Sequence, residues 1–274
     1  MPLISRCIFS LSLLAFTCSF GAVVSAHEYY LMPETFTPKV NELLPVRHRL
    51  GKLFKGNELP WITKWNIRSE VWEAGNKRHA KSLDGDRPAL KIKLSNPRLA
   101  TVVHQSSVDF LTFKTYEKFT KYVTKEGMTH ALKASEEGTK PKIGLLEAYS
   151  RFAKTIVNVD GDTKGLDVVT GLKIELVALA NPLALGSKEP MPVQVLYEGK
   201  PLVGVSVKVY EGIGNNFAYH TPTDANGKAM IKAAGPGPYL INAIHMTEPQ
   251  SDLAKSKKAH WESFWASLTF QRKK

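Results

Sequence analysis

The residues of this chain best suited to chemistry are its histidines, and the first of them follows a predicted cleavage site. Residues 1–26 combine a basic start with an apolar run, and Val24 and Ala26 occupy the −3 and −1 positions of a signal-peptidase cut. Cleavage after Ala26 would make His27 the first residue of the mature chain. An N-terminal histidine offers both its α-amine and its imidazole to one metal ion, so we predict a metal ligand at His27. The competing interpretation is that His27 follows the cut without a role.

Three internal histidines are candidates to complete a metal site. His245 ends a strand-like segment and shares a face with Ile241 and Ala243. His48 and His104 also fall on the apolar faces of alternating segments. We predict His245 as the second ligand. His48 and His104 are further candidates, with core packing as the alternative for each.

No local metal signature is present among these residues. The sequence contains no His-x-His and no His-Glu-x-x-His, and both cysteines, Cys7 and Cys18, lie in the expected signal peptide. The mature chain therefore has neither a disulfide nor a thiolate site. A metal site would have to be assembled from distant strands.

Catalytic motifs are also missing from the sequence. There is no Gly-x-Ser-x-Gly elbow and no cysteine nucleophile after cleavage, so we do not expect an enzyme. One enzymatic alternative uses His27 in a copper histidine brace that attacks polysaccharide oxidatively. Intrinsic affinity for nitrogen ligands falls from Cu²⁺ through Ni²⁺ to Co²⁺, which keeps copper open. A structural envelope module without a metal site is the third alternative.

Alternating segments predict that these histidines stand on a β scaffold. Leu43 to Leu50 places Val46, His48 and Leu50 on one face, and further strands are expected over 89–94 and 99–104. From 108 to about 155 the apolar spacing becomes helical, including a second helix-like piece over 143–155. We therefore predict a β-sandwich domain over 27–186 with a helical insert at about 108–155.

A second β pattern begins after Gly186. Strands are expected over 191–197, 203–210, 239–246 and 261–270, separated by turns such as the loop around Asn226-Gly227. Such a succession is typical of an immunoglobulin-like or transthyretin-like sandwich. The predicted fold is thus mainly β, with a second sandwich domain over 187–274.

Charge and hydropathy indicate an exported chain in solution. The formal net charge is +12, but the lysines are scattered rather than gathered into one basic motif, so we expect no nucleic-acid partner. After residue 26 no apolar run reaches the length of a membrane span, and we expect no transmembrane segment in the mature chain. We therefore expect the mature chain to be exported and soluble.

An ordered set of motifs resembles a family of exported proteins described as a periplasmic component of a cobalt or nickel transport system, otherwise filed as a domain of unknown function. The motifs span nearly the whole mature chain. They are His27-Glu28-Tyr29-Tyr30, residues 119–128, 147–154 and 172–176, Tyr197-Glu198-Gly199-Lys200-Pro201-Leu202, residues 223–227 and residues 261–270.

The resemblance implies a protein that assists nickel or cobalt uptake. Its expected partners are a divalent transition-metal ion and a membrane metal-transport complex. With the residues above, this gives the predicted function: a periplasmic binding protein that holds Ni²⁺ or Co²⁺, or alternatively Cu²⁺, through His27 and His245.

Overall fold

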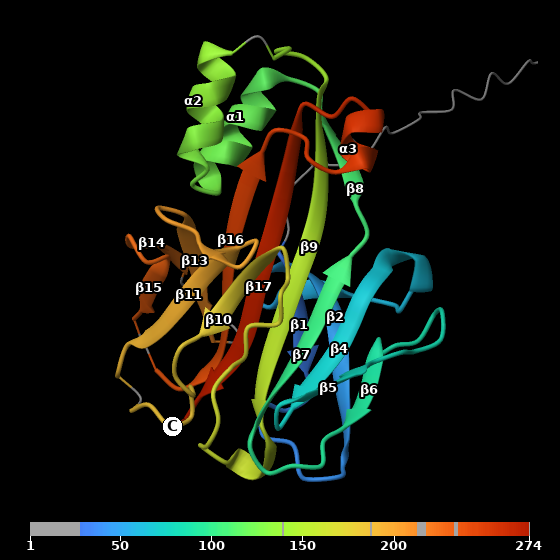
Figure 1. The fold of residues 1–274 in the computed structure, drawn as a ribbon, viewed down its shortest axis with the longest axis vertical. Coiled ribbons are helices and arrows are strands. Elements are labelled where there is room, and N and C mark those ends of the chain that lie inside the picture. Colours follow the sequence, from blue (N-terminus) through green and yellow to red (C-terminus); the bar gives the residue numbers. More distant parts are fainter. Residues whose placement is uncertain (1–27, 139, 187, 213–217, 233–234, 274) are drawn as a thin grey trace, which may run out of the picture.

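The computed structural model describes residues 28–138, 140–186, 188–212, 218–232 and 235–273, and the fold is mainly β, as expected (Figure 1). The predicted cleavage site and His27 lie outside the described residues. No helix in the described ranges has the length and apolar character needed to cross a bilayer.

The largest sheet runs through the whole length of the molecule (Figure 1). Its strands are β4 (Asn66–Glu73), β5 (Asn76–His79), β7 (Leu99–Ser106), β8 (Asp109–Phe113), β9 (Leu145–Asn158), β13 (Ser206–Glu211), β14 (Ala218–Pro222), β16 (Gly237–Thr247) and β17 (Trp261–Arg272). The order is β14-β13-β16-β17-β9-β7-β4-β5, with β8 also paired to β9. The long strands β17 and β9 are parallel, and the other pairs are antiparallel.

Two four-stranded sheets complete the β structure. We call the first the N-terminal small sheet; it contains β1 (Tyr29–Pro33), β2 (Leu43–Lys52), β3 (Lys55–Leu59) and β6 (Leu90–Lys93). The second, the C-terminal small sheet, contains β10 (Ile174–Ala178), β11 (Met191–Tyr197), β12 (Lys200–Pro201) and β15 (Lys228–Ile231).

The two small sheets cover opposite faces of the large sheet. In β7, Ala100 and Val102 join the core beneath the N-terminal small sheet, whereas Leu99 and Val103 join the core beneath the C-terminal small sheet. Alternate residues of a strand point to opposite faces, so this division requires a layer on each side. The result is a three-layer β structure, and the central strands are buried on both faces.

The helical insert is shorter than its predicted range. It consists of α1 (Tyr116–Lys125) and α2 (Thr129–Glu137). The N-cap of α1 is Thr115, whose side chain accepts a hydrogen bond from the Lys118 amide. Phe119 and Val123 of α1 pack against Ile244 and Trp261 at one end of the large sheet. A third short helix, α3 (Asp252–Ser256), connects β16 to β17. Two 3₁₀ turns are also present, Thr63–Trp65 before β4 and Val159–Gly161 after β9.

The helix expected over 143–155 is wrong, because most of that stretch is the strand β9. From Phe152 onward its residues are buried on both faces. A strand covered on both sides loses the alternation that identifies it in sequence, and its apolar residues then also fit a helical spacing.

The boundary predicted at Gly186 falls inside a sheet. β10 precedes it, β11 follows it, and the two pair from Ile174 with Tyr197 to Ala178 with Val193. β17 likewise pairs with β9 across nine residue pairs, from Trp261 with Glu147 to Thr269 with Thr155. The C-terminal sandwich is therefore built partly from strands of the first segment.

Candidate functional site

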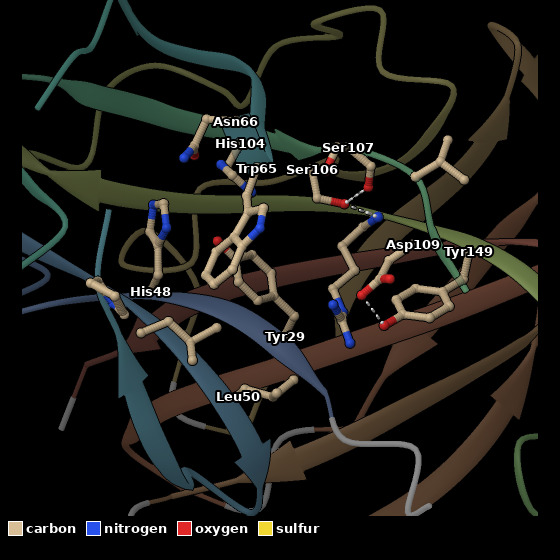
Figure 2. Close-up of a pocket in the computed structure, with 14 residues that line it drawn as sticks. Tyr29, His48, Leu50, Trp65, Asn66, His104, Ser106, Ser107, Asp109 and Tyr149 are labelled. Atoms are coloured by element: carbon tan, nitrogen blue, oxygen red, sulfur yellow. Dashed lines mark hydrogen bonds between the residues drawn. The ribbon is translucent and has the colours of Figure 1, made fainter. Parts of the chain in front are cut away.

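A cavity of about 370 Å³ lies where β2 and β3 of the N-terminal small sheet face β7 and β9 of the large sheet (Figure 2). Figure 2 shows His48, His104, Trp65 and Tyr29 grouped on one side and Asp109 with Tyr149 on the other. The lining residues are Tyr29, His48, Leu50, Leu59, Pro60, Trp65, Asn66, His104, Ser106, Ser107, Val108, Asp109, Tyr149 and Arg151.

The cavity brings together two of the predicted ligands, His48 and His104. His48 lies on β2 opposite Leu31 of β1, and His104 lies on β7 opposite Ala153 of β9. Their ring centres are 4.6 Å apart, and their exposed fractions are 3% and 2%. The ring of Tyr29 lies 5.1 Å from that of His104 and 5.7 Å from that of His48.

The nitrogens of this pair are only partly occupied by hydrogen bonds. Nδ1 of His104 lies 3.4 Å from Oγ of Ser69, which leaves Nε2 for another partner. Nε2 of His48 is buried and has no hydrogen-bond partner among the described residues. Buried polar atoms without a partner are rare in folded proteins, and each one calls for an explanation such as a bound ion.

Burial keeps both imidazoles uncharged. It lowers the pKa of His48 to about 3, and it lowers the pKa of His104 well below the usual range, with His48 and Arg151 adding to the shift. At neutral pH each ring therefore has a nitrogen lone pair, which is the form that coordinates metals.

The opposite wall of the cavity contains Arg151 between two tyrosines. Its guanidinium carbon is 4.7 Å from the ring centre of Tyr149 and 5.8 Å from that of Tyr29. Tyr149 donates a hydrogen bond to Oδ2 of Asp109 at 2.8 Å, and the Arg151 amide donates to Oγ of Ser106 at 2.9 Å. Arg151 is two residues before Ala153 on β9, so the two side chains point to the same face of the sheet. Ala153 pairs with His104, and Arg151 therefore lies on the face that carries His104.

His245 lies on the other side of the large sheet. It follows Ile241 and Ala243, which belong to the core beneath the C-terminal small sheet. Its ring is 4.6 Å from Tyr197 and 5.7 Å from His130, and burial lowers its pKa to about 4. The large sheet therefore separates His245 from His48 and His104, and these three residues do not form one site.

His27 lies outside the described residues, but its neighbour Glu28 is buried. Glu28 forms an ion pair with Lys208, Oε1 to Nζ 3.2 Å, and accepts a hydrogen bond from the Tyr210 hydroxyl. Lys208 and Tyr210 pair with Asn242 and Leu240, on the face of β16 opposite to His245. The expected pairing of His27 with His245 thus gains no support from the neighbouring residue.

No group of three or more histidine, cysteine, aspartate and glutamate side chains in the described ranges is arranged to hold a metal. The His48–His104 pair supplies two nitrogen donors, so further ligands of a bound ion must come from outside this set. The cavity provides the room for them.

Sequence reasoning did not select Arg151 or Tyr149 as site residues. Two positions apart, they share a face in a strand but point in different directions in a helix. Because residues 143–155 were expected to be helical, the two were not placed together. The sequence signal that could have found them is that both residues belong to the motif over residues 147–154.

Two solved structures are distantly similar to this chain. One is the "D0-D1 domain of Intimin", with 14% identity, a TM-score of 0.21, and coverage of 89% of this chain and 97% of that chain. Another is the "tetra-tandem repeat in extending region of large adhesion protein", with 11% identity, a TM-score of 0.20, and coverage of 89% and 49%. At these TM-scores neither likeness carries an argument about the site.

The search of curated proteins found no match. A family model does match, over residues 24–247, and its description is a domain of unknown function. Because that match spans most of the chain, the protein belongs to this family, DUF4198.

Proposed function

We propose that this protein binds a divalent transition-metal ion at His48 and His104 and acts as a binding protein without turnover. The observation that carries the proposal is the buried, unpartnered Nε2 of His48 beside the ring of His104. Leaving such a nitrogen without a partner costs about 1–3 kcal/mol of stability, which a bound ion would offset.

The spacing of the two rings is compatible with a shared ion. With metal–nitrogen bonds of about 2.0–2.1 Å, each ring centre would lie about 3.2 Å from the metal. A ring separation of 4.6 Å then corresponds to an angle of about 90° at the ion. Adjacent positions of octahedral or tetragonal sites subtend this angle, and these are geometries common for Ni²⁺, Co²⁺ and Cu²⁺.

The proposal extends to the identity of the metal and to the cellular role. The motif resemblance supports nickel or cobalt uptake in the periplasm, with delivery to a membrane metal-transport complex. Nitrogen donors alone favour copper. The role of His27 as a further ligand stays a prediction; it stands two residues before Tyr29 of the cavity, and two residues span at most about 7 Å.

Calorimetric titration with Ni²⁺, Co²⁺ and Cu²⁺ tests this function. We expect His48→Leu and His104→Leu each to lower the affinity at least about 100-fold, because each removes one of two protein donors. His245→Leu is the matched control and should bind as the native protein does. A native affinity in both cavity variants contradicts the proposal.

Two further experiments test the N-terminal ligand and the oxidative-enzyme alternative. One extra residue ahead of His27 converts the α-amine into an amide, so weaker binding in the extended protein would establish the N-terminal ligand. With copper and a reductant, release of oxidised oligosaccharides by the native protein but not by His48→Leu would replace the binding function with an oxidative enzyme.

A further inference from the structure

Arg151 is the cation in the cavity wall, and its charge has no carboxylate partner among the described residues. Other cations on the large sheet do: Lys154 pairs with Asp167 and Glu175, and Lys208 pairs with Glu28 and Glu126. Asp109, the acidic residue of the lining, instead accepts the hydroxyl hydrogen of Tyr149. The Arg151 guanidinium contacts the two tyrosine rings and also interacts with the Tyr149 hydroxyl.

The cavity is larger than a metal ion and its water ligands require. Its volume is about 370 Å³, whereas one water occupies about 30 Å³ in the liquid. Pockets for small organic molecules begin at about 300 Å³. The aromatic surfaces of Tyr29 and Trp65, the latter 48% exposed, are further features of a small-molecule site.

We propose that the cavity takes the metal as a complex with a small chelator that carries at least one carboxylate, and that Arg151 binds this carboxylate. The chelator's other nitrogen or oxygen donors would occupy the metal positions that His48 and His104 leave open. The planar guanidinium matches a carboxylate with two parallel hydrogen bonds, which a lysine cannot reproduce. This inference rests on the proposed metal site.

The charges of the site fit such a ligand. The two imidazoles are neutral ligands, so a divalent ion and Arg151 together bring three positive charges to a cavity whose lining contains one carboxylate, Asp109. An anionic chelator compensates part of this positive charge, whereas a neutral chelator leaves the full charge of the metal ion in place. The expected ligand class is therefore hydroxy or amino polycarboxylates rather than diamines.

Calorimetry with three probes tests the inference: Ni²⁺ alone, Ni²⁺ with citrate, and Ni²⁺ with ethylenediamine. In the native protein we expect the citrate complex to bind about 10- to 100-fold more tightly than either other probe, as expected for a hydrogen-bonded charge pair. Arg151→Gln should lose this preference but keep its affinity for Ni²⁺ alone. Arg151→Lys should retain only part of it.

Lys121→Gln, which removes an exposed positive charge on α1, is the control and should behave as the native protein does. Equal binding of the citrate and ethylenediamine complexes by the native protein, or an undiminished preference in a folded Arg151→Gln, overturns the inference. If the native protein binds Ni²⁺ alone, either result leaves the metal site standing. If it binds none of the three probes, the metal site itself is wrong.

Discussion

Glu147 is a carboxyl group in the protein interior that forms no ion pair with any residue that the structure describes. It is 1% exposed, and it accepts hydrogen bonds from the Tyr122 hydroxyl at 2.9 Å and from the Ser263 hydroxyl. Burial raises its pKa to about 7, although both hydrogen bonds and Arg151 favour the charged form. In the folded protein Glu147 is therefore mostly protonated below about pH 7.

The raised pKa predicts a stability change with pH. Below about pH 4.5 Glu147 is protonated in both the folded and unfolded states and adds no pH dependence. Between about pH 4.5 and 7 only the folded state holds the proton, so the free energy of unfolding falls as the pH rises, by up to about 3 kcal/mol. Glutamine mimics the protonated form and removes this loss.

We therefore expect Glu147→Gln to gain stability over the native protein as the pH rises from 5 to 7, with a constant difference above 7. Urea unfolding at pH 5, 6, 7 and 8 measures it, and Glu136→Gln on the exposed side of α2 should match the native protein throughout. A difference independent of pH would contradict the shifted pKa of Glu147.

At the scale of elements, β9 connects the layers of the molecule. It pairs with β7 and β8 along one edge and with β17 along the other. Its residue Lys154 is 1% exposed, with Nζ 2.8 Å from Asp167 and 2.9 Å from Glu175. Glu175 also accepts hydrogen bonds from the backbone of the preceding loop. This cluster attaches β10 and the loop before it to the large sheet.

Lys154→Met should destabilise the protein by about 3–5 kcal/mol, because it leaves two buried carboxylates without their cation. Lys121→Met is the control: it breaks an exposed pair with Glu117, and such pairs contribute about 0–1 kcal/mol. Urea unfolding of both variants at one pH compares them. Equal stabilities would mean that the buried cluster does not hold β10 in place.

At the scale of the whole molecule, the large sheet joins both halves of the chain. Leu99, Phe152 and Ile156, from before the predicted boundary, share one core with Val207 and Phe264, from after it. The molecule thus closes its C-terminal core only when the first segment is present. This arrangement makes folding of the second half depend on the first.

We expect the isolated segment 188–274 to lack a cooperative fold, because it exposes the edge of β17 that pairs with β9 and loses the pairing of β11 with β10. Circular dichroism and thermal melting of this segment measure the result. Co-expression with residues 27–187 is the control and should yield a folded complex. Cooperative melting of segment 188–274 alone would instead support the independent domain expected from the sequence.

The sequence by itself determined much of the local β structure. Alternation located β2 and β11, because over most of each strand every second residue is buried and the residues between are less so. The strands β7, β16 and β17 are buried on both faces and were found as short apolar segments, β7 and β16 each directly after a turn. Helical spacing located α1. β9 is also buried on both faces from Phe152 onward, but its apolar residues fit a helical spacing, and its misassignment hid the shared direction of Tyr149 and Arg151.

The site depended on tertiary structure for a different reason. Alternation showed that His48, His104 and His245 each lie on an apolar face, since a side chain's face is a local property of its strand. Which faces meet is decided by how sheets pack. His48 and His104 meet because the N-terminal small sheet covers the face of β7 that carries His104, whereas His245 lies beneath the other small sheet.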